Sequence, residues 1–564
     1  MIFIHNYFPK YTKKLIELGI AAKGDGFKVT QSYATPEEYR FNNIAGRGGE
    51  LYLIVKDYAS CFYIDRLQGG VFYSEYDYDR DLLDEYGRMC DFLGFQLHEL
   101  GTTRMLDWCR VERQLKALGL ARTEENVIEA VRQVSANKTV LHFSQGRPKE
   151  YAGGKKPETL TEAFADVLSV IERAKERTGN RIFNCDAGTS LAAMDGKAGL
   201  KLSFIEVGCQ TLYSRMQYAL RRGVSRASGG KWGAYLEPWS HMANGTTCYC
   251  FMRNGSNEWF VGGEGFAYNH DGERGGSSMS YARRMMYYSL FSGADYFSEE
   301  WGQSNTFYDF EGFELSPYGK IKQEFCTFAR KFKNVKPYCP VAIIIPREYG
   351  VFNTHCRAFP YEECKDDTRD GRWRSLPRKI VRLMYNGERL GEEDVYDGTS
   401  LGSEDRYFTV GRYGSILDVI FEDSYEHPEE HYELVLDYTG RFAADGVKII
   451  DANNEALVLA SLDRLVSCSL PVSIESTRSV DYIFFENEGR KHLAVFNHSG
   501  VSKDLDSGEQ VNPAATVSLT LSVREGSIIE IYPLGGRILS CEGGIMTAEL
   551  DGGEMLLIEY KNDN

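Results

Sequence analysis

One short stretch combines a carboxylate with two indole rings, and it is the part of the sequence best suited to chemistry. In GGKWGAYLEPWS, residues 229–240, Glu237 ends an apolar run, and Pro238 stops the predicted strand directly after it. Trp232 and Trp239 lie on either side of the glutamate. A carboxylate beside apolar ring faces is typical of sites that bind and cleave sugars. A buried strand that ends in a salt-bridged glutamate is the structural alternative.

Several other polar residues lie at predicted strand ends or in a Gly-rich loop and could share a site with Glu237. Cleaving a glycosidic bond takes two carboxyl groups that flank it. In a barrel of parallel strands, such groups lie at the carboxyl ends of the strands. The candidates are His98, Glu99, Asp186, Glu206, Glu264, Glu299 and Glu300. We expect them to bind sugar hydroxyls or hold protons, with Trp239 and Trp301 as platforms for a sugar ring. For any one acid alone, a structural salt bridge is the alternative.

Strands that alternate with helices must position these residues. Helical spacing of apolar residues marks 82–93, 104–119, 124–135, 160–180, 210–222 and 279–292. Apolar runs that predict strands occupy 51–55, 61–67, 95–101, 139–146, 181–188, 199–208, 294–302 and the run that ends in Glu237. This alternation predicts a parallel sheet. Because strand after strand ends in polar residues, we expect a closed (β/α)8 TIM barrel instead of a doubly wound sheet.

The pattern changes twice after the predicted barrel. Two prolines precede the apolar run VAIII in KPYCPVAIIIP, residues 336–346, which begins a new strand. The runs SILDVIFED and YELVLDY and a later helix extend this part into a smaller α/β domain. From about residue 474 apolar residues recur with period two between turns, which predicts a β-sandwich-like module. The predicted domains are therefore 1–336, 337–473 and 474–564.

Composition limits the partners that this chain can have. Its formal net charge of −16 makes nucleic acid and anionic membrane surfaces poor ligands. The 13 cysteines are scattered without a metal-type spacing, which favours a reducing compartment. The amino-terminal residues resemble no signal peptide, and no uncharged apolar run approaches the length of a membrane span. We expect a cytoplasmic protein without a metal or cofactor.

The order of several motifs resembles glycoside hydrolase family 42 and its relatives in the (β/α)8-barrel clan. The motifs are GK-x5-E, then a helix, SGADYF-x3-W, ELSPYG and the PVAIIIP strand. The resemblance implies a barrel, then a glutamine-amidotransferase-like α/β domain that packs a homotrimer, then a small β domain. It implies Glu237 as the nucleophile at the end of the seventh strand and Trp301 at the end of the eighth. The activity implied is exo-acting cleavage of a terminal sugar from an oligosaccharide or glycoside.

The chain departs from this family at the acid/base residue. The family carries that glutamate in an Asn-Glu pair at the end of the fourth strand. Here the predicted fourth strand reads TVLHFSQGRPKE, with Gln145 near that place and Glu150 later. We therefore expect Glu206, on the strand next to Glu237, to be the general acid, ahead of Glu99 and Glu150. The sugar, its anomer and the stereochemical outcome stay open.

Two functions of other classes remain as alternatives. A metal-dependent hydrolase could use His98, His142 and His241, although the sequence has no HxH or HExxH motif. A carbohydrate-binding barrel that has lost its acid would explain the missing Asn-Glu pair. A dinucleotide-binding enzyme is disfavoured, because the Gly-rich run at 262–276 does not lie between a strand and a helix.

Overall fold

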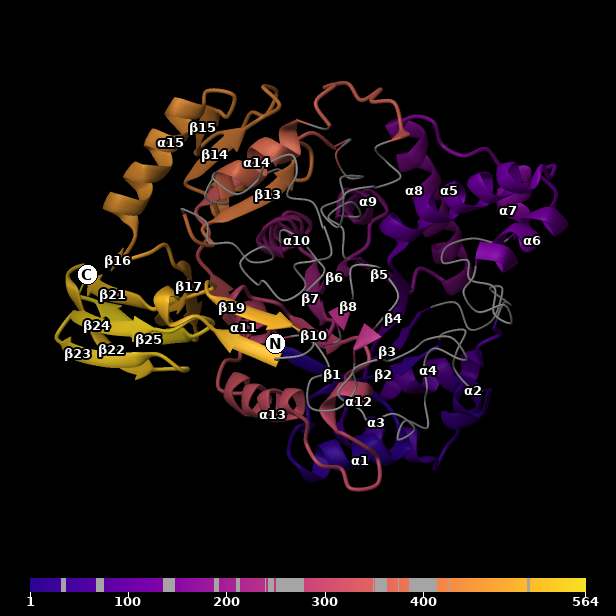
Figure 1. The fold of residues 1–564 in the computed structure, drawn as a ribbon, viewed down its shortest axis with the longest axis horizontal. Coiled ribbons are helices and arrows are strands. Elements are labelled where there is room, and N and C mark those ends of the chain that lie inside the picture. Colours follow the sequence, from indigo (N-terminus) through magenta and orange to yellow (C-terminus); the bar gives the residue numbers. More distant parts are fainter. Residues whose placement is uncertain are drawn as a thin grey trace.

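The computed structural model describes most of the chain in fifteen stretches. These are residues 1–31, 37–66, 76–134, 148–186, 192–208, 214–238, 240–241, 248–249, 278–347, 349, 363–373, 375–384, 413–425, 427–504 and 508–563. Among them, no helix has both the length and the apolar character needed to cross a membrane. Figure 1 shows a central barrel with antiparallel sheets at one end and helices α5–α8 at the other.

Eight parallel strands close into the barrel, in the order β1-β10-β7-β6-β5-β4-β3-β2. Their bounds are β1 Ile2–Asn6, β2 Gly26–Thr30, β3 Cys61–Asp65, β4 Asp91–His98, β5 Ile182–Asp186, β6 Leu202–Val207, β7 Lys231–Leu236 and β10 Tyr296–Glu299. The register of β1 against β10 completes the ring, with Ile2 opposite Tyr296. The predicted barrel is therefore confirmed.

Alternation along the strands divides their side chains between the barrel interior and the helices outside. The interior core consists of Ile4, Cys61, Tyr63, Phe183, Cys185, Phe204, Tyr235 and Tyr296. Gly233 makes room for one of these rings, because a Cβ atom there would lie 2.3 Å from Cε1 of Phe204. Since the pleat has a period of two, residues in step with this core also point inward at the carboxyl ends of the strands.

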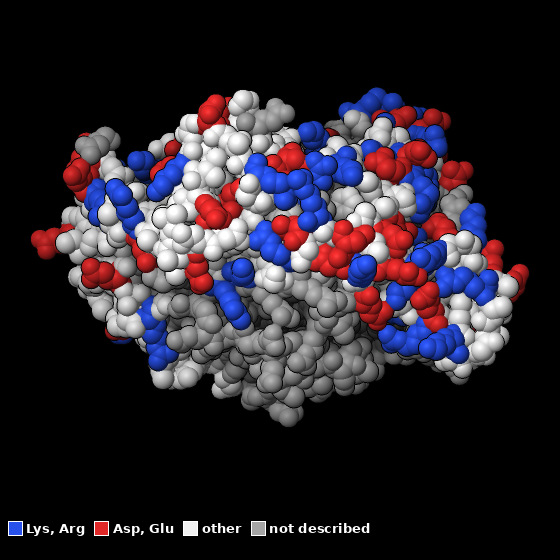
Figure 2. Space-filling model, turned by 90° about the horizontal axis from the view of Figure 1, so that it is seen from above, with Lys and Arg blue, Asp and Glu red and all other residues white. Residues whose placement is uncertain are grey.

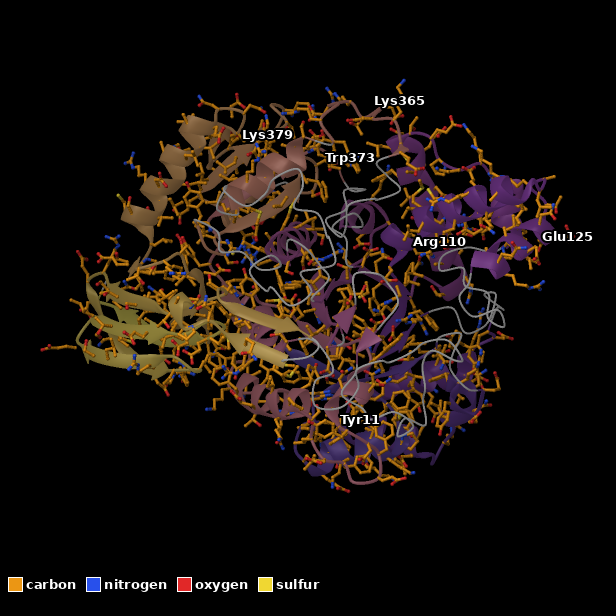
Figure 3. All side chains as sticks on the ribbon, viewed as in Figure 1. Tyr11, Arg110, Glu125, Lys365, Trp373 and Lys379 are labelled. Carbon is orange, nitrogen blue, oxygen red and sulfur yellow. The ribbon has the colours of Figure 1, made fainter. Side chains whose placement is uncertain are left out.

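Helices cover the outer face of the barrel. Their bounds are α1 Pro9–Glu17, α2 Phe41–Ile44, α3 Glu50–Tyr58, α4 Arg80–Met89, α5 Leu100–Leu118, α6 Glu124–Val134, α7 Pro148–Gly153, α8 Leu160–Thr178, α9 Ala192–Lys197, α10 Ser214–Ser228, α11 Met279–Phe291, α12 Gly302–Thr306 and α13 Pro317–Ala329. Local chemistry sets the ends of α8, where Thr159 and Glu162 form a capping box and Gly179 takes a left-handed conformation. Figure 3 labels Tyr11 of α1, whose hydroxyl contacts Thr306 of α12.

One of the predicted barrel strands is wrong, and another lies outside the described residues. Residues 51–55 lie inside helix α3, where Leu51, Ile54 and Val55 form one buried face. That spacing is helical, and the apolar run concealed it. The predicted strand 139–146 lies outside the described residues, and the barrel closes without it because β4 pairs directly with β5.

Strands β1 and β2 were not anticipated. The barrel still has eight strands, because β1 and β2 take the places of the two predicted strands that it lacks. The strands that end at Asp186, Val207 and Leu236 remain the fifth, sixth and seventh of the barrel. The fourth strand, however, is Asp91–His98.

Beyond the barrel, a parallel sheet is followed by antiparallel ones, as the predicted fold class requires. Strands β12 Val341–Ile345, β13 Leu417–Phe421, β14 Leu434–Asp437 and β15 Lys448–Asp451 are parallel, in the order β13-β12-β14-β15. Helices α14 Leu376–Met384 and α15 Glu455–Arg464 belong to the same part of the chain. Strand β11, Val335–Pro337, instead joins the antiparallel sheet β11-β17-β18-β25-β22.

The carboxyl-terminal part is all β. Its strands are β16 Val472–Ser476, β17 Asp481–Asn487, β18 Arg490–Phe496, β19 Val501–Asp504, β20 Gly508–Val511, β21 Val517–Val523, β22 Gly526–Tyr532, β23 Arg537–Glu542, β24 Ile545–Leu550 and β25 Met555–Asn562. The order β16-β21-β24-β23 forms its second antiparallel sheet. On the face seen in Figure 2, acidic and basic side chains of the described residues are interspersed.

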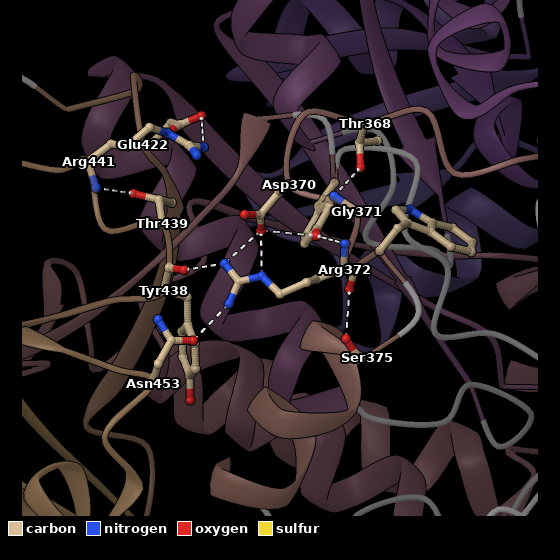
Figure 4. Close-up of polar contacts among 12 residues, drawn as sticks. Thr368, Asp370, Gly371, Arg372, Ser375, Glu422, Tyr438, Thr439, Arg441 and Asn453 are labelled. Atoms are coloured by element: carbon tan, nitrogen blue, oxygen red, sulfur yellow. Dashed lines mark hydrogen bonds and ion pairs between the residues drawn. The ribbon is translucent and has the colours of Figure 1, made fainter.

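A segment near residues 363–384 links the barrel to the parallel sheet. Its Lys365 accepts a backbone hydrogen bond from Leu160 at the start of α8, and Figure 3 labels Lys365, Trp373 and Lys379 along it. Arg372 fixes the other end (Figure 4): it donates to Asp370, to the carbonyl oxygen of Tyr438 and to Asn453. This guanidinium therefore lies at the carboxyl end of the parallel sheet, where open α/β sheets usually bind ligands.

Candidate active site

Four strands of the barrel bring polar side chains together at their carboxyl ends. His98 ends β4, Glu206 lies in β6, and Glu237 and Glu300 directly follow β7 and β10. Glu206, Glu237 and Glu300 are in step with Phe204, Tyr235 and Tyr296 of the interior core. None of the four site residues is more than 6% exposed. The structure thus places three of the predicted carboxylates and the predicted histidine in one buried cluster.

Arg66 ties this cluster together, and the sequence analysis did not anticipate it. It follows β3 in a left-handed conformation with φ of 67°. Its guanidinium pairs with Glu300 and donates to Nε2 of His98 over 3.2 Å. A guanidinium can only donate, so His98 is the acceptor in this contact. Arg66 stands at the end of the predicted strand 61–67, so its position alone could have marked it as a site residue.

Histidine 98 also approaches two of the carboxylates. Its Nε2 atom lies 3.5 Å from Oε1 of Glu206 and 3.4 Å from Oε1 of Glu300. Ligand atoms of these three residues lie within 4.8 Å of one another, a spacing that would suit a metal ion. The Arg66 guanidinium already contacts two of the three, which favours a carboxylate site over a metal site.

Burial and nearby negative charge act on the pKa values of the two central glutamates. Burial raises the pKa of Glu206 well above its ordinary value, and the charges of Glu237, Glu99 and Glu300 raise it further. Burial also raises the pKa of Glu237, as do Glu300 and Glu99, whereas a hydrogen bond from Glu206 opposes this rise. Both shifts favour the protonated form of these two carboxyl groups.

Glu99 lies beside this pair at the end of the fourth strand. It follows His98, precedes α5 and has a left-handed backbone with φ of 50°. This backbone conformation ends the alternation of side chains along β4. The charge of Glu99 raises the pKa of both Glu206 and Glu237. The side chain is partly exposed, unlike that of Glu206. The dipeptide His98–Glu99 therefore occupies the place that TVLHFSQG was expected to fill.

Three acids from the sequence analysis point elsewhere. Asp186 accepts a hydrogen bond of 2.7 Å from the backbone of Gly101 at the start of α5. Glu299 pairs with Lys322 and accepts from Tyr318, both on α13. Both acids are out of step with the inward-facing residues of their strands, so they face the helices.

The third of these acids, Glu150, lies in α7 and pairs with Arg104 and Arg173, 3.2 Å from each. These contacts give Glu150 partners on α5 and α8.

The aromatic candidates are only partly described. Trp301 follows Glu300 with φ of 51° and is partly buried at the start of α12. Trp239, Glu264, Gln145 and His142 lie outside the described residues. His241 belongs to the short strand β8, Ser240–His241.

A separate pocket of about 800 Å³ lies on the flank of the barrel. Its walls include Leu83 of α4, Phe95 of β4 and Thr178 of α8. None of the clustered site residues lines it, so the buried carboxylates and this pocket are distinct features.

Comparisons with known proteins give low-identity matches to solved structures. No family model matches this chain. No curated protein matches it either. A GH42 β-galactosidase from G. stearothermophilus is similar at 10% identity and a TM-score of 0.48, covering 99% of this chain and 98% of that one.

Two further solved structures show the same degree of likeness. The α-L-fucosidase isoenzyme 2 from Paenibacillus thiaminolyticus matches at 10% identity and a TM-score of 0.41, covering 100% of both chains. An exo-carrageenase of GH42 from Bacteroides ovatus matches at 9% identity and a TM-score of 0.43, covering 100% of this chain and 82% of that one. By their descriptions, these three solved structures are glycoside hydrolases.

Proposed function

We propose that this chain is a glycoside hydrolase that removes a terminal sugar from an oligosaccharide or glycoside. The observation that carries the proposal is the buried group of carboxyls at the carboxyl ends of the barrel strands. Hydrolysis of a glycosidic bond needs one carboxylate that is ionised and one carboxyl group that holds a proton. The structure gathers such groups in one place: Glu206 and Glu237 are buried with raised pKa values, and Glu99 beside them is partly exposed.

Glu237 is the nucleophile in this proposal, and Glu99 is the general acid. Glu206 was the first expectation for the acid, but its side chain has no exposed surface, whereas an acid must reach the departing oxygen. Glu99 ends the fourth strand, where the resembling family carries its acid, and it is more accessible than Glu206.

The proposed reaction has two steps. Glu237 attacks the anomeric carbon while Glu99 gives its proton to the departing oxygen, and a glycosyl ester forms. Glu99 then removes a proton from a water molecule as that water attacks the anomeric carbon of the ester, and the bond to Glu237 breaks, so that Glu237 leaves as a carboxylate. Glu206, on the neighbouring strand β6, supports Glu237 within the buried cluster. This pairing predicts retention of configuration.

Sugar contacts are proposed for His98 and Glu300, held in place by Arg66, and for Trp239, Trp301 and Glu264. A homotrimer assembled through the parallel α/β part, and a cytoplasmic location, belong to the same proposal. The molar mass of the purified protein in solution tests the trimer.

A panel of nitrophenyl glycosides of both anomers tests the activity. The variant Glu237→Gln should lower kcat by about three orders of magnitude or more while the circular dichroism spectrum stays unchanged. Glu99→Gln should slow substrates with poor leaving groups far more than nitrophenyl substrates, because a nitrophenolate leaves without a proton. If Glu206→Gln shows that leaving-group dependence instead, Glu206 is the acid. Near-normal activity in Glu237→Gln overturns the proposal.

A further inference from the structure

A lysine is fully buried inside the barrel, near the carboxylate cluster. Lys28, in the middle of β2, has no exposed surface. Its Nζ atom donates to Oδ2 of Asp65 over 3.2 Å, to the hydroxyl of Tyr235 over 3.1 Å and to the carbonyl oxygen of Glu299 over 2.8 Å. All three N–H groups of the ammonium ion are therefore used.

Each partner of Lys28 is a near neighbour in sequence of a residue in the site. Asp65 precedes Arg66, and the Glu299 carbonyl precedes Glu300. Tyr235 lies two residues before Glu237 on the same face of β7, and its hydroxyl also donates to Asp65 over 3.0 Å. One ammonium group thus joins the carboxyl ends of β3, β7 and β10, at the points where they deliver their site residues.

Stability alone is a poor reason for such an arrangement. Burying an ion pair costs several kcal/mol per ion in desolvation, and apolar residues of similar volume often give equal or greater stability. Burial lowers the pKa of Lys28, and Asp65 opposes that shift. The benefit of this lysine must therefore be looked for in the geometry and charge that it gives to the site.

We propose that Lys28 is a positioning residue, which holds Arg66, Glu237 and Glu300 in their relative places. The expected effect of Lys28 on catalysis rests on the proposed function, whereas its role in holding these three residues in place does not. The charged and titratable groups around Lys28 are Asp65 and Tyr63 of β3, Tyr235 of β7, Cys185 of β5, and Glu300 after β10. Replacing Lys28 by Met removes all three hydrogen bonds at similar side-chain length.

The chain offers a matched control. Lys322 is also buried and pairs with a carboxylate, that of Glu299, but this pair lies on the helix side of the barrel wall. Lys28→Met and Lys322→Met should both lower the unfolding temperature. Only Lys28→Met should lower kcat by tenfold or more, with a smaller change in KM, because positioning acts on the reacting geometry. Lys322→Met should leave kcat within threefold.

A second measurement is independent of activity. His98 contacts Arg66, which follows Asp65, and packs edge-on against Tyr235, a partner of Lys28, whereas Lys322 acts on His5. In nitrogen-15 spectra of the imidazoles, Lys28→Met should shift the His98 signals and leave those of His5 in place, and Lys322→Met should do the reverse. If the parent protein cleaves no glycoside, the proposed function fails, and these spectra still decide the role of Lys28.

Two results overturn the inference. One is a kcat for Lys28→Met within threefold of that for Lys322→Met in an active enzyme. The other is a set of His98 signals that Lys28→Met leaves unmoved. If Lys28→Met does not fold, Tyr235→Phe removes one hydroxyl from the same network and should shift His98 in the same direction by a smaller amount.

Discussion

At the scale of single residues, the site consists of groups that folding buries at a cost in free energy. Glu237, Glu206, His98 and Glu300 could be predicted because each follows or ends an apolar run. Lys28 could not, since a charged side chain in the middle of GFKVT breaks the apolar pattern of β2. Only closure of the barrel supplies its partners on three other strands.

Glu206 should reduce the stability of the protein at neutral pH. Its pKa in the folded state is raised, so the folded protein keeps a proton that the unfolded chain loses near its ordinary pKa of about 4.3. Stability is therefore highest below that value and falls as the pH rises toward the folded pKa. Glu206→Gln should raise the free energy of unfolding at pH 7 by at least about 1 kcal/mol.

The same variant should differ little from the parent near pH 4, where Glu206 is protonated in both states. Calorimetric unfolding temperatures at the two pH values measure this difference. A variant that is no more stable than the parent at pH 7 would show that the charge of Glu206 is well accommodated.

At the scale of elements, helix α10 of the barrel packs against strand β13 of the parallel sheet. Residues 214–225 of it are all buried. Arg222 and Arg226 reach across to Asp418 of β13, each over 2.6 Å. A Cβ atom on Gly223 would lie 2.5 Å from the carbonyl oxygen of Val419, so this glycine permits the close approach of helix and strand. Periodicity could predict that 210–222 is a helix, but the strand packed against it lies about 200 residues later.

Gly223→Ala tests this contact. Alanine favours a helix over glycine by about 1 kcal/mol, yet here the added methyl group should destabilise the protein by about 1–3 kcal/mol through overpacking. Gly196→Ala in α9 is the control, since a Cβ atom there has no neighbour within 4 Å and should stabilise the protein. Equal unfolding temperatures for the two variants would contradict the close packing of α10 on β13.

At the scale of the whole molecule, buried charges join the barrel to the carboxyl-terminal sheets. Arg215 of α10 pairs with Asp481 of β17 over 2.5 Å, and Nε2 of His498 lies 3.4 Å from the same carboxylate. Arg284 of α11 contacts the other nitrogen of His498 over 2.8 Å. Composition and alternation could predict the sequence of barrel, α/β and β parts. They could not predict these contacts, which depend on surfaces that only the folded parts present.

Asp481→Asn should weaken this junction in a pH-dependent way. Burial alone would raise the pKa of Asp481, but Arg215 and His498 outweigh it and the pKa is lowered. The stabilisation is present above the ordinary pKa of about 3.9 and is lost as the pH falls through the folded value. We expect a loss of about 3–5 kcal/mol at pH 7 and a smaller one in acid.

Unfolding temperatures at pH 7 and at pH 2, well below the ordinary pKa of an aspartate, measure the effect. Glu486→Gln, at an exposed position of the same strand, should have no effect at either pH. An equal loss at both pH values would assign the cost to packing instead of charge.

The pairing of β1 with β10 determines when this barrel can form during synthesis. The first strand to leave the ribosome has one of its two neighbours some 290 residues away in the sequence. Until the segment ending at Glu299 has emerged, both edges of the growing sheet expose unpaired backbone groups. Such distant pairing makes folding slow and leaves nascent chains open to aggregation, so this protein should depend on chaperones more than its stability alone would require.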